Sequence, residues 1–310
     1  MFSLVIPTHN RAAILRRSMA YLLQLEGIEN CEIIVVNDGS TDDTAAVLEE
    51  FRQAASNLVR VFTLPNSGPA RARNCGVKAA RNERILFVDD DVFPRPGMLQ
   101  SHARLLDQGY TGSQGLLVWH EDVPITPLIR YIDSRGSQFA FDQVQDQTQL
   151  KFSHVYTGNL AVLRSAVLAA GGFDEEIFDK DMALAAFEDT ILGYSLIKNG
   201  ARLALNREAI ADHLHDMTEQ GFFQREYKVG YYIGRLRNKY PDVARSLGWD
   251  RNDNSPQSQV RLLRLFNKAG ISKPLLGYAL SMRLRQREAF LGGMVKFKRE
   301  SGSKEIAPRR

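Results

Sequence analysis

The chain has 310 residues, of which 44% are hydrophobic and 25% are charged, and its formal net charge is +4. This ordinary globular composition is long enough for one large domain with an appendage, or for two domains. The two cysteines, Cys31 and Cys75, exclude a disulfide framework and are expected to be reduced packing residues, and no run approaches the ~18 consecutive apolar residues that a membrane span requires.

Charge is divided unevenly along the chain. Residues 217–310 hold 20 Lys and Arg against 8 Asp and Glu, a net charge of +12, whereas residues 1–216 hold 20 basic and 28 acidic residues, a net charge of −8. This asymmetry indicates that the acidic body could hold metal and that the basic end could meet an acidic surface such as a membrane, a polyanionic acceptor or nucleic acid. Because Met1 leads directly into a strand-like segment, we expect no signal peptide and a cytoplasmic protein that could reach the inner face of the membrane.

Strand-like and helix-like segments alternate over the first third of the chain. Near-continuous apolar strands separated by helices predict an α/β fold whose mostly parallel, mixed sheet is flanked by helices on both faces. In such a sheet, ligands bind beyond the carboxyl ends of the strands. The predicted strands span 2–6, 32–36, 59–64 and 84–88, and the predicted helices span 12–25, 43–54, 70–80 and 97–106.

The pattern is mixed from residue 110 to residue 216 and then becomes helical and basic. We expect helices through the basic region 217–300 and disorder in the tail 301–310. The elements predicted before that region are a strand at 115–119, helices at 127–132 and 183–198, and short strands at 202–205 and 209–213.

Three consecutive carboxylates, Asp89, Asp90 and Asp91, directly follow the apolar strand 85–88. Adjacent acids repel one another and resist burial, so a strand that delivers three of them to its carboxyl end usually meets a cation there. Mg²⁺ and Mn²⁺ bind carboxylate oxygens and commonly share the ion with a substrate phosphate. A solvated acidic turn is the alternative interpretation of the same residues.

Several other short motifs follow one another along the chain. In order, the motifs are Val5-Ile6-Pro7-Thr8-His9-Asn10, Val35-Val36-Asn37-Asp38-Gly39-Ser40-Thr41-Asp42, Asn66-Ser67-Gly68-Pro69-Ala70-Arg71-Ala72-Arg73-Asn74, Phe87-Val88-Asp89-Asp90-Asp91, Gly158-Asn159, Gly171-Gly172-Phe173-Asp174-Glu175 and Glu188-Asp189. Together they resemble the family-2 glycosyltransferases of GT-A fold, and the resemblance covers residues 1–215. It implies a GT-A domain at 1–216, with a nucleotide-binding half at 1–109 and an acceptor-binding half at 110–216.

The resemblance implies how a nucleotide is held. Asp38 would hydrogen-bond the base, usually uracil, beside a backbone cradle from Pro7 and Thr8, although a turn residue is the alternative interpretation of Asp38. Arg73 fits the family's Ala-Arg-Asn pattern better than Arg71, and a guanidinium near a helix start suits a diphosphate. The full set of implied nucleotide contacts is Pro7, Thr8, Asn10, Asp38, Arg73, Asp89 and Asp90.

The resemblance also implies a divalent metal, Mn²⁺ or Mg²⁺, bound at an Asp-x-Asp motif. Asp91 would coordinate the ion that bridges the nucleotide phosphates. His213 and His215 are two residues apart, so on a strand they point the same way. One of them, with His213 favoured, would be a further ligand; two packed or exposed histidines are the alternative.

An acidic pair, Glu188 and Asp189, lies near the start of the hydrophobic part of the predicted helix 183–198. Favourable charge at a helix N-terminus is one interpretation of this pair. The resemblance implies instead that Asp189 is the catalytic base, supported by Glu188, in a single displacement with inversion. The residues it places near the donor and acceptor sugars are Gly158, Asn159 and Asp174.

These features together predict an inverting, metal-dependent glycosyltransferase. It would move a sugar from a nucleotide-sugar, with a UDP-sugar favoured, to a saccharide or lipid-linked acceptor. A non-catalytic protein of the same fold and a nucleotidyltransferase remain alternatives, and the absence of G-x-G-x-x-G after the first strand disfavours a dehydrogenase. The basic region is expected to be either a packed helical appendage or oligomer interface, or a surface for peripheral membrane contact, and no nucleic acid is expected.

Overall fold

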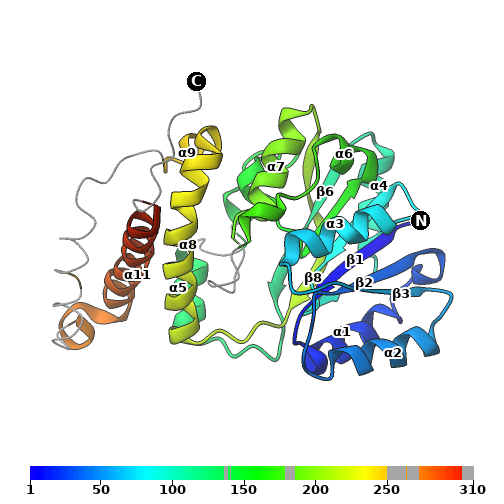
Figure 1. Ribbon diagram of the computed structural model, residues 1–310, viewed down its shortest axis with the longest axis horizontal. Coiled ribbons are helices and arrows are strands. Elements are labelled where there is room, and N and C mark those ends of the chain that lie inside the picture. The colour runs from blue at the N-terminus through cyan, green and yellow to red at the C-terminus, as the bar shows by residue number, and fades with distance from the viewer. Residues whose placement is uncertain (136–138, 140, 179–185, 250–262, 264–271, 302–310) are drawn as a thin grey trace. The chain divides into compact units, whose positions relative to one another are not determined.

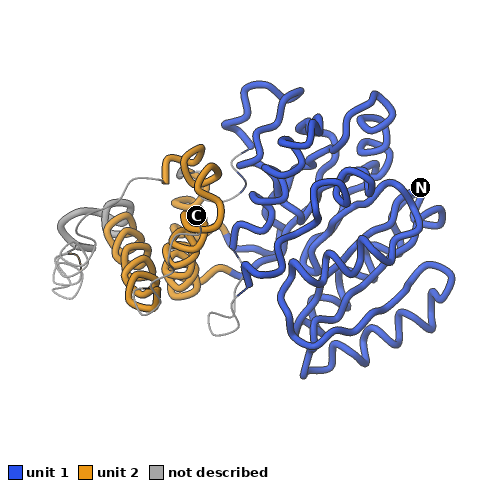
Figure 2. The backbone as a smooth tube through the Cα atoms, turned by 45° about the horizontal axis from the view of Figure 1, so that its top comes forward, with its two compact units in different colours: residues 1–124, 136–216 blue, residues 125–135, 217–310 orange. Residues whose placement is uncertain are grey.

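The computed structural model divides the chain into two compact units, which Figure 2 colours separately. The first unit comprises 1–124 and 136–216, and the second comprises 125–135 and 217–310. Residues 125–135 group with the basic region rather than with the chain segments on either side of them. The residues that the structure describes are 1–135, 139, 141–178, 186–249, 263 and 272–301.

One sheet, with eight strands among the described residues, forms the centre of the first unit. Its strands are β1 Ser3–Thr8, β2 Glu32–Asn37, β3 Val59–Thr63, β4 Arg84–Val88, β5 Val92–Pro94, β6 Gly112–Trp119, β7 Asn159–Leu163 and β8 Leu203–His213. The strand order is β3-β2-β1-β4-β7-β6-β8-β5; β1 to β4 run parallel, and β7 is antiparallel to both β4 and β6. This mixed sheet confirms the predicted α/β fold class.

Helices cover both faces of this sheet. They are α1 Ala12–Leu22, α2 Thr44–Ala54, α3 Pro69–Ala79, α4 Met98–Asp107, α6 Arg164–Ala169 and α7 Glu188–Lys198. Figure 1 shows α1 and α2 on one side of the sheet and α3 on the other. Right-handed crossovers place α1 and α2 on one face and α3 on the other. The reason is that the chain moves outward from β1 to β2 and β3 and then returns past β1, in the opposite direction, to β4. Leu4, Ile34 and Phe87 are fully buried in the core between the layers.

The later part of the sheet differs from the expected elements. The two short strands expected at 202–205 and 209–213 form a single strand, β8, whose pairing with β6 shifts register between Gly115 and Leu116. The residues that β8 inserts at this irregularity include Arg207-Glu208, and their polarity imitates a turn in the sequence. β5 and β7 were not predicted: β5 has only three residues, and β7 is defined by its pairing with β4 and β6, which lie far from it in the sequence.

Gly76 lets α3 approach β1 closely. A Cβ at this position would lie 2.3 Å from Cγ1 of the fully buried Val5. Gly76→Ala is therefore expected to destabilise the first unit by about 1–3 kcal/mol, even though alanine favours helix. Thermal melting would measure the loss, with exposed Lys78→Ala on the same helix as a control that stays within about 0.5 kcal/mol. An unchanged melting temperature for Gly76→Ala would contradict the tight contact.

The second unit is helical in the part that the structure describes. Its helices are α5 Pro127–Arg135, α8 Glu219–Lys239, α9 Pro241–Ser246 and α11 Ser272–Ser301. The backbones of α8 and α11 lie close together, because a Cβ at Gly230 would stand 1.9 Å from the carbonyl oxygen of Phe290. Gln286 of α11 accepts a hydrogen bond from the Tyr131 hydroxyl at 2.7 Å and donates one to Glu226 at 2.9 Å, which ties α5, α11 and α8 together.

The last described residues of the chain belong to helix α11. The tail 301–310 was expected to be disordered. Its first residue, Ser301, is the last residue of α11, and residues 302–310 lie outside the described residues. Among the described residues, no helix is both long enough and apolar enough to cross a bilayer. The predicted membrane contact of the basic region stays a prediction.

Candidate active site

The turn after β4 carries the three acids to the carboxyl end of the parallel strands. The N–H of Val92 donates to the carbonyl of Asp89 at 3.2 Å, and β5 then pairs with β8. Because Val92 pairs with His213 in that ladder, Asp91 lies beside the end of β8. Asp90 is only 7% exposed and Asp91 only 4%, so these two acids are not part of a solvated turn.

Asp90 faces the end of β1, where Pro7 and Thr8 lie. Its carboxylate accepts hydrogen bonds from Thr8 Oγ1 at 2.7 Å and from Arg11 Nε at 3.3 Å, and its carbonyl accepts from Ser18 Oγ at 2.8 Å. Burial raises the pKa of Asp90 to about 7, although Arg11 acts in the opposite direction. Since the Thr8 hydroxyl is held by Asp90, the nucleotide cradle predicted for Pro7 and Thr8 would come from their backbone.

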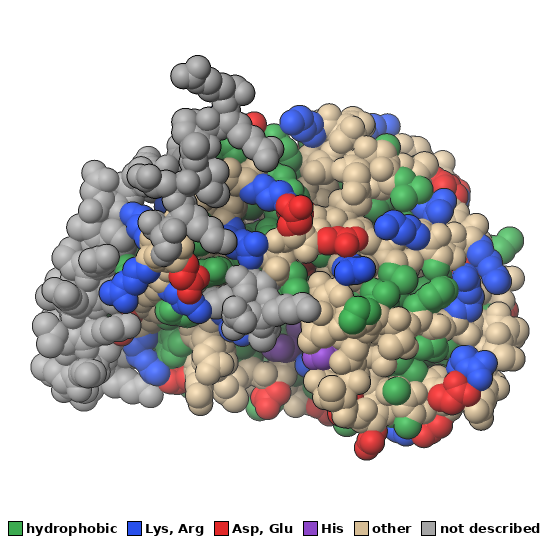
Figure 3. All heavy atoms as spheres, in the orientation of Figure 1, with side chains coloured by type: hydrophobic (Ala, Val, Ile, Leu, Met, Phe, Trp, Pro, Cys, Tyr) green, Lys and Arg blue, Asp and Glu red, His purple; other side chains and the backbone are tan. Residues whose placement is uncertain are grey.

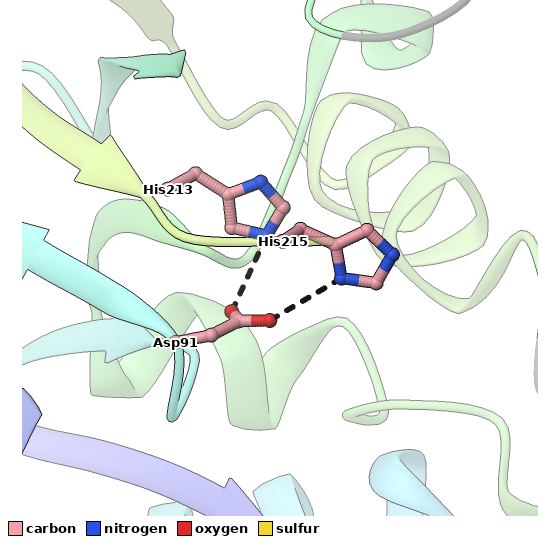
Figure 4. Close-up of side chains that lie close together, drawn as sticks. All are labelled: Asp91, His213 and His215. Atoms are coloured by element: carbon pink, nitrogen blue, oxygen red, sulfur yellow. Dashed lines mark ion pairs between the residues drawn. The ribbon is translucent and has the colours of Figure 1, made fainter. Parts of the chain in front are cut away.

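Asp91 and the two histidines at the end of β8 come together as a candidate metal centre (Figure 4). Asp91 Oδ1 lies 3.3 Å from His213 Nε2, and Asp91 Oδ2 lies 3.5 Å from His215 Nδ1. The three ligand atoms lie within 4.8 Å of one another. One carboxylate and two imidazoles suit a divalent transition metal, so these residues fit the ion that the resemblance implies. Both histidines, rather than one, face the aspartate.

Aromatic packing orients the buried histidine of this group. His213 is 8% exposed, and its ring centroid lies 5.2 Å from that of Phe139 and 6.2 Å from that of Trp119. Its Nδ1 has no hydrogen-bond partner in the part of the chain that is described. The His215 ring stacks on it, with 5.4 Å between centroids, and is more exposed. In the space-filling view, histidine side chains reach the molecular surface (Figure 3).

Arg11 adds a positive charge to the same aspartate. Its Nη2 donates to Asp91 Oδ2, the oxygen that also faces His215. Although burial opposes it, the contacts with His213, His215 and Arg11 hold the pKa of Asp91 well below its usual range. Asp91 is therefore ionised at neutral pH, as a carboxylate ligand to a metal must be.

Arg73 of α3 joins the acidic turn to the start of α7. Its Nη2 donates to Asp89 Oδ1 at 2.8 Å, and its Nη1 donates to Glu188 Oε1 at 3.4 Å. Although burial opposes the charge, the neighbouring carboxylates, Asp89 above all, raise the pKa of Arg73, which stays cationic. Arg71, the other candidate, is half exposed and lies 3.8 Å from Glu175 instead.

The acidic pair occupies the first turn of α7. Asp189 accepts two hydrogen bonds from Thr157, one from Oγ1 at 2.8 Å and one from the backbone N–H at 3.3 Å, and it forms no ion pair with the residues described. Burial raises the pKa of both carboxyls, and the charge of Asp189 adds to this for Glu188. A carboxylate with a raised pKa and no cationic partner in direct contact is suited to act as a base.

Polar side chains fasten the loops beyond β1, β2 and β3 to one another. The buried Asp38 carboxylate accepts from the N–H groups of Ser67 at 2.8 Å and Gly68 at 2.7 Å, at the start of α3. Burial raises the pKa of Asp38, although these two donors oppose the shift. Asn10, at φ 54°, accepts from the N–H of Thr41 at 2.7 Å. Since each carboxylate oxygen has two lone pairs, Asp38 retains acceptor capacity for a ligand.

The neighbouring residues Gly158 and Asn159 lie in different environments. A Cβ at Gly158 would lie 3.1 Å from Oδ2 of Asp89, so this glycine borders the acidic turn. The Asn159 side chain is fully buried: its Nδ2 donates to one carbonyl of β6 and one of β8, each at 3.0 Å, and its Oδ1 lies 2.9 Å from His102 Nε2. The amide of Asn159 thus faces the interior of the sheet, and the expected place of this residue near the donor and acceptor sugars stays a prediction.

Asp174 lies on a loop that is anchored to α3. Its side chain accepts from the N–H of Glu176 at 3.1 Å and caps a short helical turn, Glu175–Ile177. Just before it, the N–H and carbonyl of Phe173 both bond to the side chain of Asn74, each at 2.9 Å. The loop that carries Asp174 is therefore held beside the helix that carries Arg73.

Three residues of this site, Arg11, Asn74 and Thr157, were not predicted. Each is the immediate sequence neighbour of a residue that was assigned a role: Asn10, Arg73 and Gly158 respectively. For Arg11 a signal was present, because a basic residue directly after the first strand-end motif complements the three acids after β4.

Comparison with known proteins identifies relatives for most of the chain. The profile of "Glycosyl transferase family 2" matches residues 3–170. The chain is 29% identical over 246 residues to the pre-mycofactocin glycosyltransferase of Mycobacterium tuberculosis (strain H37Rv), covering 77% of this chain and 48% of that protein. It is 28% identical over 189 residues to the minor teichoic acid biosynthesis protein GgaA of Bacillus subtilis, covering 57% and 40%. The chain thus spans half or less of these relatives.

Solved structures share the fold at low sequence identity. The mannosyltransferase PcManGT from Pyrobaculum calidifontis, in complex with GDP-Man and Mn²⁺, superposes with a TM-score of 0.66 at 12% identity, covering 96% of this chain and 86% of that one. S. aureus TarS 1–349 in complex with UDP gives a TM-score of 0.55 at 18% identity, covering 96% and 91%. These likenesses confirm the predicted GT-A fold. Because the family profile matches more than half of its length, the chain belongs to glycosyl transferase family 2.

Proposed function

We propose that this protein is an inverting glycosyltransferase that moves a sugar from a nucleotide-sugar, with a UDP-sugar favoured, to the hydroxyl of a saccharide or lipid-linked acceptor. The observation that carries the proposal is the position of Arg73, whose guanidinium holds Asp89 and Glu188 together. It joins the acidic turn to the helix that begins with Asp189. A donor diphosphate at the turn and an acceptor hydroxyl at α7 would therefore meet in one place.

Asp189 is the base in the proposed reaction. The acceptor hydroxyl gives its proton to this carboxylate as its oxygen bonds to the anomeric carbon, and the bond between that carbon and the diphosphate oxygen breaks. Two hydrogen bonds from Thr157 hold the carboxylate in place. Arg73, which stays cationic, offsets negative charge on the departing diphosphate. One base opposite the leaving group gives a single displacement with inversion.

Asp91, His213 and His215 would hold the divalent metal. When bound, the metal supplies Lewis-acid stabilisation of the leaving diphosphate. Two imidazole ligands favour Mn²⁺ over Mg²⁺, because Mg²⁺ prefers oxygen ligands in an octahedral arrangement. Mn²⁺ complexes of two structural neighbours, PcManGT and GalNAc-T7, support this choice.

The names of the relatives support a carbohydrate polymer as the acceptor. GgaA is a minor teichoic acid biosynthesis protein, and TarS is a poly(ribitol-phosphate) beta-N-acetylglucosaminyltransferase that has been solved with UDP-GlcNAc. We propose an acceptor in a cell-surface polymer. The basic region 217–310, with its net charge of +12, would attract an anionic polymer or a membrane surface.

Thermal melting with nucleoside diphosphates tests this proposal directly. UDP, GDP, ADP and dTDP would each be added with Mn²⁺, with Mg²⁺ and with EDTA. We expect UDP with Mn²⁺ to raise the melting temperature by about 5 °C or more at 100 times its dissociation constant, because ligand binding stabilises the native state by mass action. A UDP shift that is equal in EDTA would contradict the metal role, and no shift with any diphosphate would contradict the donor site.

The pH dependence of the reaction provides a second test. Because burial raises the pKa of Asp189, this carboxyl takes up its proton at a higher pH than an ordinary aspartate, whose pKa is about 4. We therefore expect kcat/KM to fall with decreasing pH from a point above pH 4. Thr157→Val removes one donor that favours the ionised form, so it should move this acid limb up by roughly 0.5–1 pH units. A limb that stays in place or moves down would contradict the assignment of Asp189.

A further inference from the structure

Arg11 pairs with Asp91, the carboxylate that a bound metal would also use. It lies three residues after the end of β1, at the N-cap of α1, and its side chain, 36% exposed, reaches across to the turn after β4. Nε donates to Asp90 Oδ1 at 3.3 Å, and Nη2 donates to Asp91 Oδ2. One guanidinium thus bridges two of the three consecutive acids and screens their repulsion.

The atom for which Arg11 and a metal would compete is Oδ2 of Asp91. This oxygen faces both the Arg11 guanidinium and Nδ1 of His215, one of the three candidate metal ligands. A divalent ion held by the same carboxylate brings a second positive charge against Arg11. Like charges at one carboxylate repel each other strongly in a partly buried site, so full Arg11 pairing and metal binding compete.

The backbone around Arg11 is fixed, so only its side chain is free to respond. The N–H of Arg11 donates to Thr44 Oγ1 at 3.1 Å. The residue before it, Asn10, is held by Ser40 and Thr41 through hydrogen bonds of 2.9 and 2.7 Å. A rotation of the partly exposed side chain away from Asp91 therefore requires no movement of β1 or of α1.

We propose that Arg11 is an exchangeable cation of the donor site: it neutralises Asp91 while no metal is bound, and it turns to the diphosphate when metal and nucleotide bind together. A guanidinium pairs with phosphate oxygens at least as well as with carboxylates, so the diphosphate replaces the partner that Arg11 gives up. Arg11 therefore weakens the binding of metal alone and strengthens the joint binding of metal and nucleotide. This inference rests on the proposed function, because it requires a metal at Asp91.

Titration calorimetry with Mn²⁺ and UDP separates these two effects. For Arg11→Gln we expect Mn²⁺ alone to bind about 3–10 times more tightly than to the wild type, because the competing cation is gone. In saturating Mn²⁺, UDP should bind about 3–10 times more weakly, because a charged partner of the diphosphate is lost. The variant therefore weakens the coupling between metal and nucleotide, and coupling is reciprocal by thermodynamic necessity.

Two further variants control for charge and for folding. Arg16→Gln removes the same charge from α1 at an exposed ion pair with Glu50, so both affinities should stay within about twofold of the wild type. Arg11→Lys keeps the charge without the planar fork and should lie between wild type and Arg11→Gln in both titrations. It provides the comparison should Arg11→Gln not fold.

These titrations distinguish a failure of the Arg11 exchange from a failure of the proposed metal role. If the wild type binds Mn²⁺ and UDP but Arg11→Gln binds Mn²⁺ alone equally or more weakly, the exchange by Arg11 is wrong and the proposed function stands. If Arg11→Gln binds UDP as tightly as the wild type does, the diphosphate contact is wrong. If the wild type binds no Mn²⁺ with or without UDP, the metal role in the proposed function fails, and the exchange fails with it.

Discussion

Asp189→Asn is expected to lower kcat by about 10²–10⁴-fold, the usual contribution of a general base. The amide keeps the size of the carboxylate and can still accept a hydrogen bond from Thr157, so the start of α7 should keep its geometry. The dissociation constant for UDP with Mn²⁺ should stay within about threefold, because Asp189 lies outside the proposed diphosphate and metal contacts. Steady-state kinetics and calorimetry on the same preparation would measure both quantities.

A surface variant supplies the control for Asp189→Asn. Asp122→Asn removes a carboxylate from an ion pair with Arg17 in which both side chains are about half exposed, so turnover and stability should be unchanged. Full turnover in Asp189→Asn would rule out Asp189 as the base and direct attention to Glu188. Loss of turnover with intact nucleotide binding would exclude the alternative of a non-catalytic binding protein.

Asp91→Asn is expected to abolish the Mn²⁺-dependent stabilisation by UDP and to weaken Mn²⁺ binding by at least about 100-fold. Asp91 is the carboxylate that both histidines and Arg11 face, and a neutral amide replaces charge attraction with a weak dipole. Thermal melting with UDP, with and without Mn²⁺, would reveal the loss. A metal-dependent shift of wild-type size in Asp91→Asn would exclude this carboxylate as a ligand.

His215→Gln tests the same centre without disturbing the core. His215 has a side chain that is 38% exposed, whereas His213 is buried among aromatic rings, so changing His215 leaves little cavity. Mn²⁺ binding should weaken by about 10–100-fold while the melting temperature of the metal-free protein is nearly unchanged. Unaltered Mn²⁺ affinity would leave His213 as the single histidine ligand, as the sequence pattern favoured.

The first half of the fold was predictable because its signals are local. Apolar runs bounded by polar or glycine-containing segments located β1 to β4, and β4 was predicted with both its ends, Arg84 and Val88. Helix α3 begins at Pro69 after Gly68, a proline start that constrains the backbone there. Strands β1, β2 and β4 are buried along nearly their whole length, so their apolar composition identifies them.

The second half was predicted less well because long-range pairing defines its elements. β7 is a five-residue segment whose role as the antiparallel strand between β4 and β6 depends on partners far away in the sequence. β8 continues through Arg207-Glu208 because β6 accommodates the extra residues by a register shift. Neither arrangement is encoded in a short window.

The amino-acid sequence by itself determined the family, the α/β architecture and the strand ends that carry the functional side chains. The tertiary structure alone decided which of those side chains meet: it put Arg73 rather than Arg71 against Asp89, brought both His213 and His215 to Asp91, buried Asn159 inside the sheet and set Arg11 across two acids. The physical reason is that periodicity and propensity act between neighbours along the chain. Charge pairing and burial depend on distances that strand order creates.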